Sequence, residues 1–293
     1  MARKNIFQLV EESYDIQTEV KKIGRLFASE NYFELGFQYS TLKKLVEEYL
    51  FSDWKYRGTC ISVEEYLTRA KADIPHTGKA KEEQIINFLE VMENFIKLYF
   101  DNGEYLLGKY NIHYYPDFNA VFCHLINTLE KYMGLTAREY KDRVIIYPEN
   151  APLEKVIDLC EEEDVQWELI RYVREDLSLN EKRKSLAYLA TNLYIEEDQE
   201  EKNEHIKELV KKAGNILNNL HIRHNNKTGK WENTALKGLD ETDAVALCDM
   251  VYNEMLTIIL LRDHKSYERT YEEFNKKQKR AKAEKKSGST ANS

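Results

Sequence analysis

The chain has 293 residues, of which 42% are hydrophobic and 32% charged, and its formal net charge at pH 7 is −8. This is the composition of a globular protein, and the scarcity of Gly (11) and Pro (4) excludes collagen-like and turn-dense all-β classes. No stretch approaches 18 uncharged apolar residues, so we expect no membrane span. The opening MARKNIFQLVEESYD carries early acids and no sustained apolar run, which argues against a secretory signal.

Charge is distributed unevenly along the chain. Residues 275–293 hold seven Lys or Arg and one Glu, which leaves residues 1–274 with a net charge of −14. An acidic body repels nucleic acid over most of its surface, so any RNA contact must be local or use the basic end. Because that end has no apolar face and finishes SGSTANS, we predict a basic disordered tail over 275–293.

The four cysteines are far apart and form no CxxC pair; they are Cys60, Cys123, Cys160 and Cys248. Such spacing fits neither a disulfide framework nor a zinc ribbon. We therefore expect a reducing, cytoplasmic setting.

Apolar residues return at three- and four-residue spacing through most of the first half. This periodicity predicts helices over 6–27, 41–51 and 81–101. Two further helices are indicated by their ends. Ser62 followed by Glu65 forms a capping box that begins one helix, and another runs from Pro116 to Gly134, a natural C-terminal cap.

One segment departs from helical spacing. Arg143–Tyr147 is short and β-branched and is followed by Pro148, so we predict a strand. Tyr110–Tyr115 is the partner we expect, in a two-stranded ribbon on a helical body. The tyrosines of this partner, with His113, have two interpretations: they stack nucleic-acid bases, or they pack the ribbon on a helix.

Helical spacing resumes after Pro148 and Pro152, which bracket a predicted boundary. The helices expected beyond it are Leu153–Glu161, Val165–Arg174, Asn180–Ile195, 200–222 and a last helix beginning near Asp240. Within that last helix Ala244–Leu261 is apolar nearly all round, which predicts the central helix of this half. The expected fold is all-α, a multi-helix bundle in two domains over 1–148 and 149–274, with one short β-ribbon near 110–115 and 143–147.

The most unusual polar segment lies before the last helix, in Asn218–Lys227. His221 and His224 are three residues apart and so share one helix face, with Arg223 beside them. Two interpretations are open. These side chains offset the negative end of the helix dipole, with Asn225 and Asn226 as a left-handed cap, or they form a site.

Asp249 is an acid inside an apolar helix, and Asn253 and Thr257 follow it at four-residue spacing as a polar ridge. We expect Asp249 to be buried, and an unpaired buried carboxylate costs several kcal/mol. Arg223 is the partner we expect, in a pair that is either structural or substrate-binding.

Metal and cofactor chemistry find little support in the sequence. His221 and His224 with Asp249 or Glu254 could supply three ligands, but HxxH alone is common and we predict no metal. The chain contains no GxxxxGK[ST], GxGxxG, HExxH or GxSxG. We therefore expect no cofactor.

The segment LHIRHNNKTG, a loop and a long helix carrying Asp249-x-x-Tyr252 resemble the C-terminal part of bacterial abortive-infection, phage-resistance proteins. Such proteins often contain a HEPN-type four-helix domain. Leu169–Tyr194 is similar to a helical module that precedes this domain, so the resemblance covers about residues 150–265. It implies a role in phage defence.

HEPN ribonucleases carry Arg and His in an Arg-polar-x(4–6)-His motif, and two copies meet in a dimer that cleaves RNA without metal. The resemblance implies Arg223, His224 and Asn226 as catalytic candidates. A His can move the proton of the 2′-OH and an Arg can stabilise charge on the phosphate. The supporting candidates it implies are His221, Asn225, Asp249, Tyr252 and Asn253.

In this chain His224 directly follows Arg223, which departs from the family spacing. The alternative function is therefore a non-catalytic helical scaffold or regulator that binds protein or RNA. The expected partners are RNA, a protein partner or phage trigger, and a second copy of the chain in a homodimer.

Overall fold

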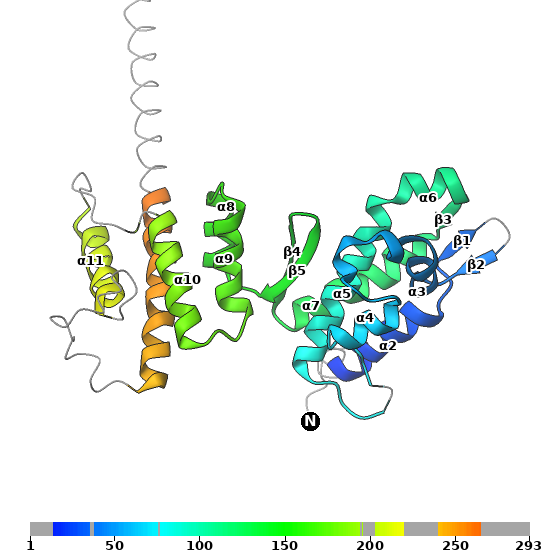
Figure 1. The fold of residues 1–293 in the computed structure, drawn as a ribbon, viewed down its shortest axis with the longest axis horizontal. Coiled ribbons are helices and arrows are strands. Elements are labelled where there is room, and N and C mark those ends of the chain that lie inside the picture. Colours follow the sequence, from blue (N-terminus) through cyan, green and yellow to red (C-terminus); the bar gives the residue numbers. More distant parts are fainter. Residues whose placement is uncertain are drawn as a thin grey trace, which may run out of the picture. The chain divides into compact units, whose positions relative to one another are not determined.

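The computed structural model describes residues 14–35, 38–75, 77–193, 195, 203–219 and 240–264 (Figure 1). The chain divides into two compact units, Met1–Glu149 (unit 1) and Asn150–Ser293 (unit 2). This division lies beside Pro148, where the sequence places its boundary. The all-α prediction is confirmed, because helices dominate the described residues and their strands form only two small sheets. The predicted tail over 275–293 lies outside the described residues.

Unit 1 is built around α5 (Glu82–Asp101), the helix predicted over 81–101. The side chains that α5 buries recur at three- and four-residue spacing along it: Ile85, Phe88, Leu89, Val91, Met92, Phe95, Ile96 and Tyr99. The other helices of this unit are α2 (Ile16–Ser29), α3 (Leu42–Leu45), α4 (Val63–Arg69), α6 (Gly103–Tyr110) and α7 (His124–Tyr132). Short turns of π- and 3₁₀-helix complete it: η1 (Val46–Leu50), η2 (Phe51–Asp53), η3 (Lys55–Arg57) and η4 (Phe118–Cys123).

Two predicted helix ends are confirmed in atomic detail. The Ser62 hydroxyl accepts the backbone N–H of Glu65 at 3.1 Å, and the Glu65 carboxylate accepts the N–H of Ile61 at 2.9 Å, so α4 begins as expected. Gly134, with φ of +63°, takes the left-handed conformation just after α7.

The strands of unit 1 form a three-stranded antiparallel sheet and a separate hairpin (Figure 1). The sheet has the order β2-β1-β3, and the hairpin joins β4 to β5. Their bounds are β1 (Phe33–Leu35), β2 (Gln38–Ser40), β3 (Ile112–Tyr114), β4 (Leu135–Tyr140) and β5 (Arg143–Pro148).

Strands exist at both predicted places, but the predicted pairing between Tyr110–Tyr115 and Arg143–Tyr147 is wrong. β5 pairs instead with β4 across the two-residue turn Lys141-Asp142, a local closure that costs little chain entropy. β3 completes the hairpin of β1 and β2, where Phe33 pairs with both Ser40 and Tyr114.

Side chains of α5 fasten the β4–β5 hairpin to the core. The Asn94 amide donates to the carbonyl of Val144 at 2.7 Å and accepts its N–H at 3.0 Å, as a neighbouring strand would. The Glu90 carboxylate accepts the N–H of Ile146 at 2.8 Å. These bonds satisfy the free edge of β5.

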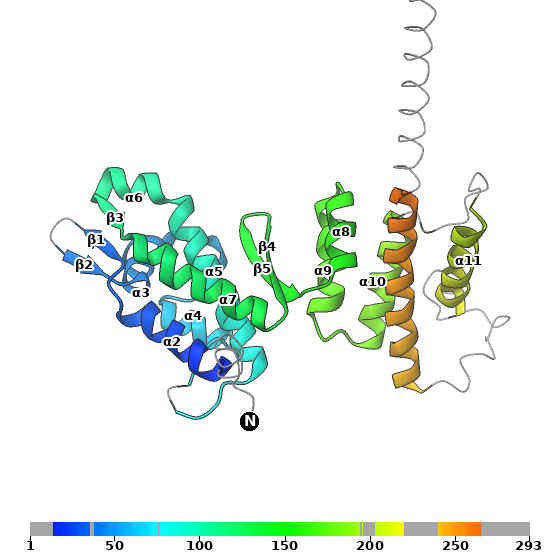
Figure 2. The ribbon, with the colours of Figure 1, turned by 180° about the vertical axis from the view of Figure 1, so that it is seen from behind.

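Unit 2 is helical throughout its described residues. Its helices are α8 (Ala151–Leu159), α9 (Glu163–Arg174), α10 (Leu179–Asn192), α11 (Glu204–Asn219) and the last helix, Glu241–His264. Figures 1 and 2 place the last helix between α10 and α11. Its start is capped as predicted, because the Asp240 carboxylate accepts the N–H of Asp243 at 2.8 Å.

The last helix buries one side and exposes the other. The buried residues are Ala244, Cys248, Val251, Tyr252, Met255, Leu256 and Ile258. Met250, on the other side, is 43% exposed, although the helix is apolar nearly all round. This is the one helix among the described residues that is long and apolar enough to cross a membrane. It makes polar contacts with α9 and α10, which are given below.

All four cysteines are free. Cys60 and Cys248 are buried, where thiols act as small apolar side chains.

Candidate functional site

Five of the predicted site residues lie outside the described residues: His221, Arg223, His224, Asn225 and Asn226. The structure therefore bears on the three supporting candidates of the last helix.

Asp249 belongs to a polar cluster that joins three helices of unit 2. Its Oδ1 accepts the Lys182 ammonium at 2.6 Å and the Tyr172 hydroxyl at 2.9 Å. The Asp249 side chain is 47% exposed, so its predicted burial is wrong. Lys182 is the described partner, because the helix is turned so that Asp249 faces the first turns of α10. The expected partner, Arg223, lies outside the described residues.

Tyr172 depends on the same carboxylate. Burial, and next the charge of Asp249, raise the pKa of Tyr172, so its hydroxyl stays a donor. Its ring stacks on that of Tyr252 at 4.3 Å and 4° between planes, and the Tyr252 hydroxyl donates to the carbonyl of Leu169 at 2.8 Å. Tyr252 is thus a core residue that ties the last helix to α9.

The polar ridge of the last helix exists, on its exposed side. The Asn253 amide donates to the Asp249 carbonyl and the Thr257 hydroxyl to the Asn253 carbonyl, both at 2.9 Å. In such bonds a side-chain donor is paired with a backbone carbonyl one turn earlier in the same helix. The three described supporting candidates therefore have structural contacts.

Metal ligands do not gather in the part of the chain that the structure describes, where no group of three His, Cys, Asp or Glu could hold an ion. Glu254, an alternative ligand in the sequence, is partly buried. Burial raises its pKa, and Lys212 acts in the opposite direction.

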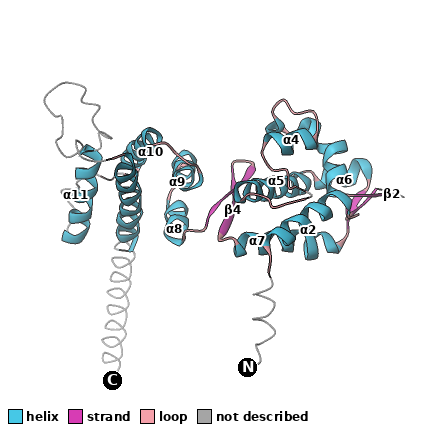
Figure 3. Ribbon diagram, turned by 90° about the horizontal axis from the view of Figure 1, so that it is seen from below, coloured by secondary structure: helices cyan, strands magenta, loops and turns pink. Residues whose placement is uncertain are grey.

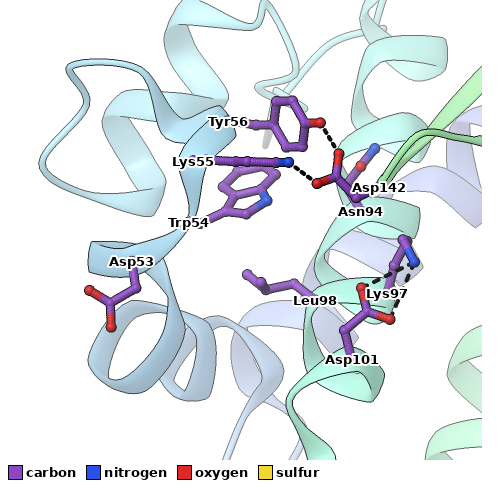
Figure 4. A pocket seen from close by; sticks show the side chains of 9 residues that line it. All are labelled: Asp53, Trp54, Lys55, Tyr56, Asn94, Lys97, Leu98, Asp101 and Asp142. Carbon is purple, nitrogen blue, oxygen red and sulfur yellow. Dashed lines mark hydrogen bonds and ion pairs between the residues drawn. The ribbon is translucent and has the colours of Figure 1, made fainter.

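Unit 1 contains a cleft that the sequence does not reveal, with a volume of about 200 Å³ (Figure 4). We call it the Trp54 cleft. Its walls come from the segment around η2 and η3, from α5 and from the β4–β5 turn. They are lined by Asp53, Trp54, Lys55, Tyr56, Asn94, Lys97, Leu98, Asp101 and Asp142.

Positive and negative charges alternate around this cleft. The Lys97 ammonium lies 3.1 Å from Asp101 and 2.7 Å from Glu139, and its pKa is raised, chiefly by the hydrogen bond to Glu139. Across the cleft, Lys55 and Tyr56 both contact the Asp142 carboxylate (Figure 4). The ammonium groups are thus held in place by carboxylates.

Two acids lie close together between α5 and α7. Glu130 is 4% exposed, and its Oε1 has no hydrogen-bond partner among the described residues. Burial, with a smaller effect from the charge of Glu93, raises the pKa of Glu130 to about 8. Burial also raises the pKa of Glu93 to about 7. Glu130 therefore holds its proton at neutral pH.

Exposed apolar side chains are frequent on the elements around α6 and β3. Of the ten large hydrophobic side chains exposed among the described residues, five come from β2, β3, α6 and the end of α5. These elements lie together in Figures 1 and 3. The five residues, which we call the aromatic end, are Tyr39, Phe100, Tyr105, Leu107 and Tyr114. The rings of Phe100 and Tyr114 are in contact at 6.0 Å, whereas Tyr39 lies on the opposite face of the sheet from Tyr114, because it pairs with Glu34 and Tyr114 pairs with Phe33.

The tyrosines weighed as base-stacking residues have different surroundings. Tyr114 is 43% exposed and contacts the Phe100 ring edge-on at 6.0 Å. Tyr110 packs against Tyr49 at 4.8 Å, and the Tyr115 hydroxyl donates to Glu34 at 3.1 Å. Tyr114 alone of these three belongs to the aromatic end.

No family model matches the chain, and no curated protein or solved structure matches it either. Its function is therefore inferred from its own contacts, charges and exposed surface.

Proposed function

We propose that the chain is a protein-binding helical module, in the phage-defence setting that the resemblance implies, and that it binds its partner through the aromatic end. The observation that carries this proposal is the exposed ring pair Phe100–Tyr114, 6.0 Å apart, with three more exposed apolar side chains on neighbouring elements at this end of unit 1. Monomeric proteins rarely expose contiguous apolar patches without a partner, and Tyr and Phe are enriched at the centres of protein interfaces.

The charge at this end favours a protein over RNA. Between Phe100 and Val121 the chain carries three acids and a single Lys, Lys109. The Lys109 ammonium lies 2.7 Å from the Tyr105 hydroxyl and over the Tyr105 and Tyr110 rings. RNA binding needs several cations that neutralise phosphates, and this surface lacks them. An apolar patch with acidic neighbours instead suits a partner with an apolar centre and a basic rim.

The Tyr114 side chain is held rigidly in the free protein. The Tyr114 ring is held edge-on by Tyr99 at 6.0 Å and by Phe118 at 6.3 Å, and both of these are buried. A side chain already fixed in the free protein loses little entropy on binding. Tyr114 is therefore suited to anchor a partner.

Site-specific photo-cross-linking in a bacterial host under phage challenge tests the proposal. A benzophenone amino acid replaces Tyr114 in the full chain, and the matched control carries it at Tyr188 in unit 2, which is 39% exposed. We expect one discrete heterologous protein adduct from position 114, absent from position 188 and lost when Phe100→Ser is added.

Equal adducts from both positions would overturn the proposal, as would an adduct of twice the chain's mass, which means a second copy. Fluorescence anisotropy with labelled single-stranded RNA gives the remaining outcome. Saturable RNA binding that is lost in the Phe100→Ser variant would replace the protein partner by RNA.

A second candidate is the metal-independent ribonuclease, with Arg223, His224 and Asn226 as its site. It is supported by the long helices that flank the segment carrying these residues, α11 before it and Glu241–His264 after it. A HEPN-like domain implies this order of helices. The homodimer and the cytoplasmic setting stay predictions of the sequence.

A further inference from the structure

The Trp54 cleft contains an unused hydrogen-bond donor. Trp54 is 7% exposed, and its ring packs edge-on against Tyr66 at 5.0 Å and Phe95 at 5.4 Å. Figure 4 shows its indole nitrogen facing the interior of the cleft. Among the described residues this N–H has no hydrogen-bond partner. The indole ring is buried but its N–H opens on the cleft, so a guest that supplies an acceptor can pair with it in place of water.

Lys55 adds donors at the same wall. Its ammonium has one carboxylate partner, Asp142, although an ammonium carries three protons. The side chain is 63% exposed, so the remaining protons are accessible. A guest carboxylate between Trp54 and Lys55 would receive a neutral and a charged hydrogen bond.

Acceptors stand on the opposite wall. The Asp101 carboxylate binds Lys97 through both oxygens, at 3.2 and 3.1 Å, and its side chain is 51% exposed. Each carboxylate oxygen has a second lone pair to offer. Leu98 lies between this wall and Trp54 in Figure 4 and supplies an apolar surface.

We propose that the Trp54 cleft binds a small zwitterion of the amino-acid class. Its carboxylate accepts from Trp54 and Lys55, its ammonium donates to Asp101, and its side chain lies against Leu98 and the indole ring. This site is independent of the aromatic end and of the predicted C-terminal site.

The charges that line the cleft favour a zwitterion over a plain anion or a plain cation as its ligand. Three Asp and two Lys line it, so a plain anion meets more carboxylates than ammonium groups. A plain cation satisfies Asp101 but leaves the Trp54 N–H without an acceptor. A zwitterion with opposite charges a few bonds apart satisfies both walls at once.

Isothermal titration calorimetry on the full chain tests the proposal with leucine as the probe. Two matched analogues each lack one charge: 4-methylpentanoate lacks the amine, and 3-methylbutylamine lacks the carboxylate. We expect saturable leucine binding, with each analogue at least tenfold weaker. Trp54→Phe, which keeps an aromatic ring but removes the N–H, and Asp101→Asn should each weaken leucine binding at least tenfold.

The matched controls are Trp167→Phe and Asp176→Asn in unit 2, which should bind leucine like the wild-type chain. Thermal melting verifies that each variant is folded, and Asp101→Asn tests the site even where Trp54→Phe loses stability. Absence of leucine binding to the wild-type chain would overturn the proposal. So would equal affinity for leucine and either analogue, or wild-type affinity in folded Trp54→Phe and Asp101→Asn.

Discussion

Lys182 of α10 and Asp249 of the last helix form an ion pair with 2.6 Å between Nζ and Oδ1. The same oxygen accepts the Tyr172 hydroxyl of α9, so one carboxylate joins three helices of unit 2. The Lys182 ammonium also lies 4.5 Å from the centre of the Tyr172 ring. The described contacts of Asp249 therefore hold the helices of unit 2 together.

Replacing Asp249 by Ala should lower stability rather than remove an activity selectively. The ion pair is partly exposed, on its Asp249 side, and contributes about 0.2–1 kcal/mol; the Tyr172 hydroxyl loses its acceptor, which adds about 1–2 kcal/mol. Chemical denaturation measures the change in the free energy of unfolding. Asn253→Ala, on the exposed side of the same helix, should change it by less than about 0.5 kcal/mol. An Asp249→Ala variant as stable as the wild type would contradict this role.

Glu130 should make unit 1 less stable as pH rises. Its pKa is about 8 in the folded chain against an ordinary 4.5, so between about pH 4.5 and 8 the unfolded chain ionises while the folded chain does not. The stability present at acid pH is lost over that window. Glu130→Met should therefore raise the free energy of unfolding by about 1–3 kcal/mol at pH 8 and by less at pH 5.

Urea denaturation at pH 5, 6.5 and 8 measures this dependence. Glu83→Gln, at the exposed start of α5, is the control and should keep the wild-type slope with pH. A Glu130→Met variant whose stability falls with pH as steeply as the wild type would show that another group is responsible.

Arg223 and His224 can be tested directly as a ribonuclease site. If they form one, induced expression of the wild-type chain in bacteria should fragment RNA and arrest growth, and the Arg223→Ala, His224→Ala double variant should do neither. His205→Ala, an exposed His on α11, should behave like the wild type. Growth arrest with intact RNA in wild type and double variant alike would exclude this site.

Asn94 should be a stabilising residue of unit 1 because its amide takes the place of a strand beside Val144. Asn94→Ala leaves the N–H and C=O of Val144 without these partners, which should cost about 1–3 kcal/mol. Thermal and urea unfolding measure the loss. Asn127→Ala, exposed on α7, is the matched control, and an equal effect of the two substitutions would refute the assignment.

The helices of the chain could be predicted because their signals are local. The apolar stripe of α5, the Ser62–Glu65 box and the left-handed Gly134 each depend on residues within a few turns of one another. The strands were harder, because β1 and β2 have three residues each and carry no usable period. The predicted ribbon failed because β4 was not expected as a strand, although it pairs with β5 across a two-residue turn. The pairing of β3 with β1, which are far apart in the chain, depends on tertiary packing.

The candidate site could also be predicted only in part, because its contacts depend on how the helices pack. Asp249 could be recognised as unusual in an apolar helix, but its exposure and its partner depend on how that helix is rotated against α10. The Trp54 cleft is assembled from three segments that are distant in the chain and have no common motif. Trp54 itself, next to Lys55 and Tyr56, was the one sequence signal that could have drawn attention to it.

The sheet β2-β1-β3 has a consequence for how the chain is made. β1 and β2 are adjacent in the chain and can pair once both have left the ribosome, but the strand that covers the other side of β1 ends at Tyr114, after all of α5 and α6 has been synthesised. Until then Phe33 cannot meet Tyr114, and the free edge of β1 is open to other nascent chains or chaperones. Slowed translation between the codons for Ser40 and Tyr114 should therefore lower the soluble yield more than slowing beyond Pro148.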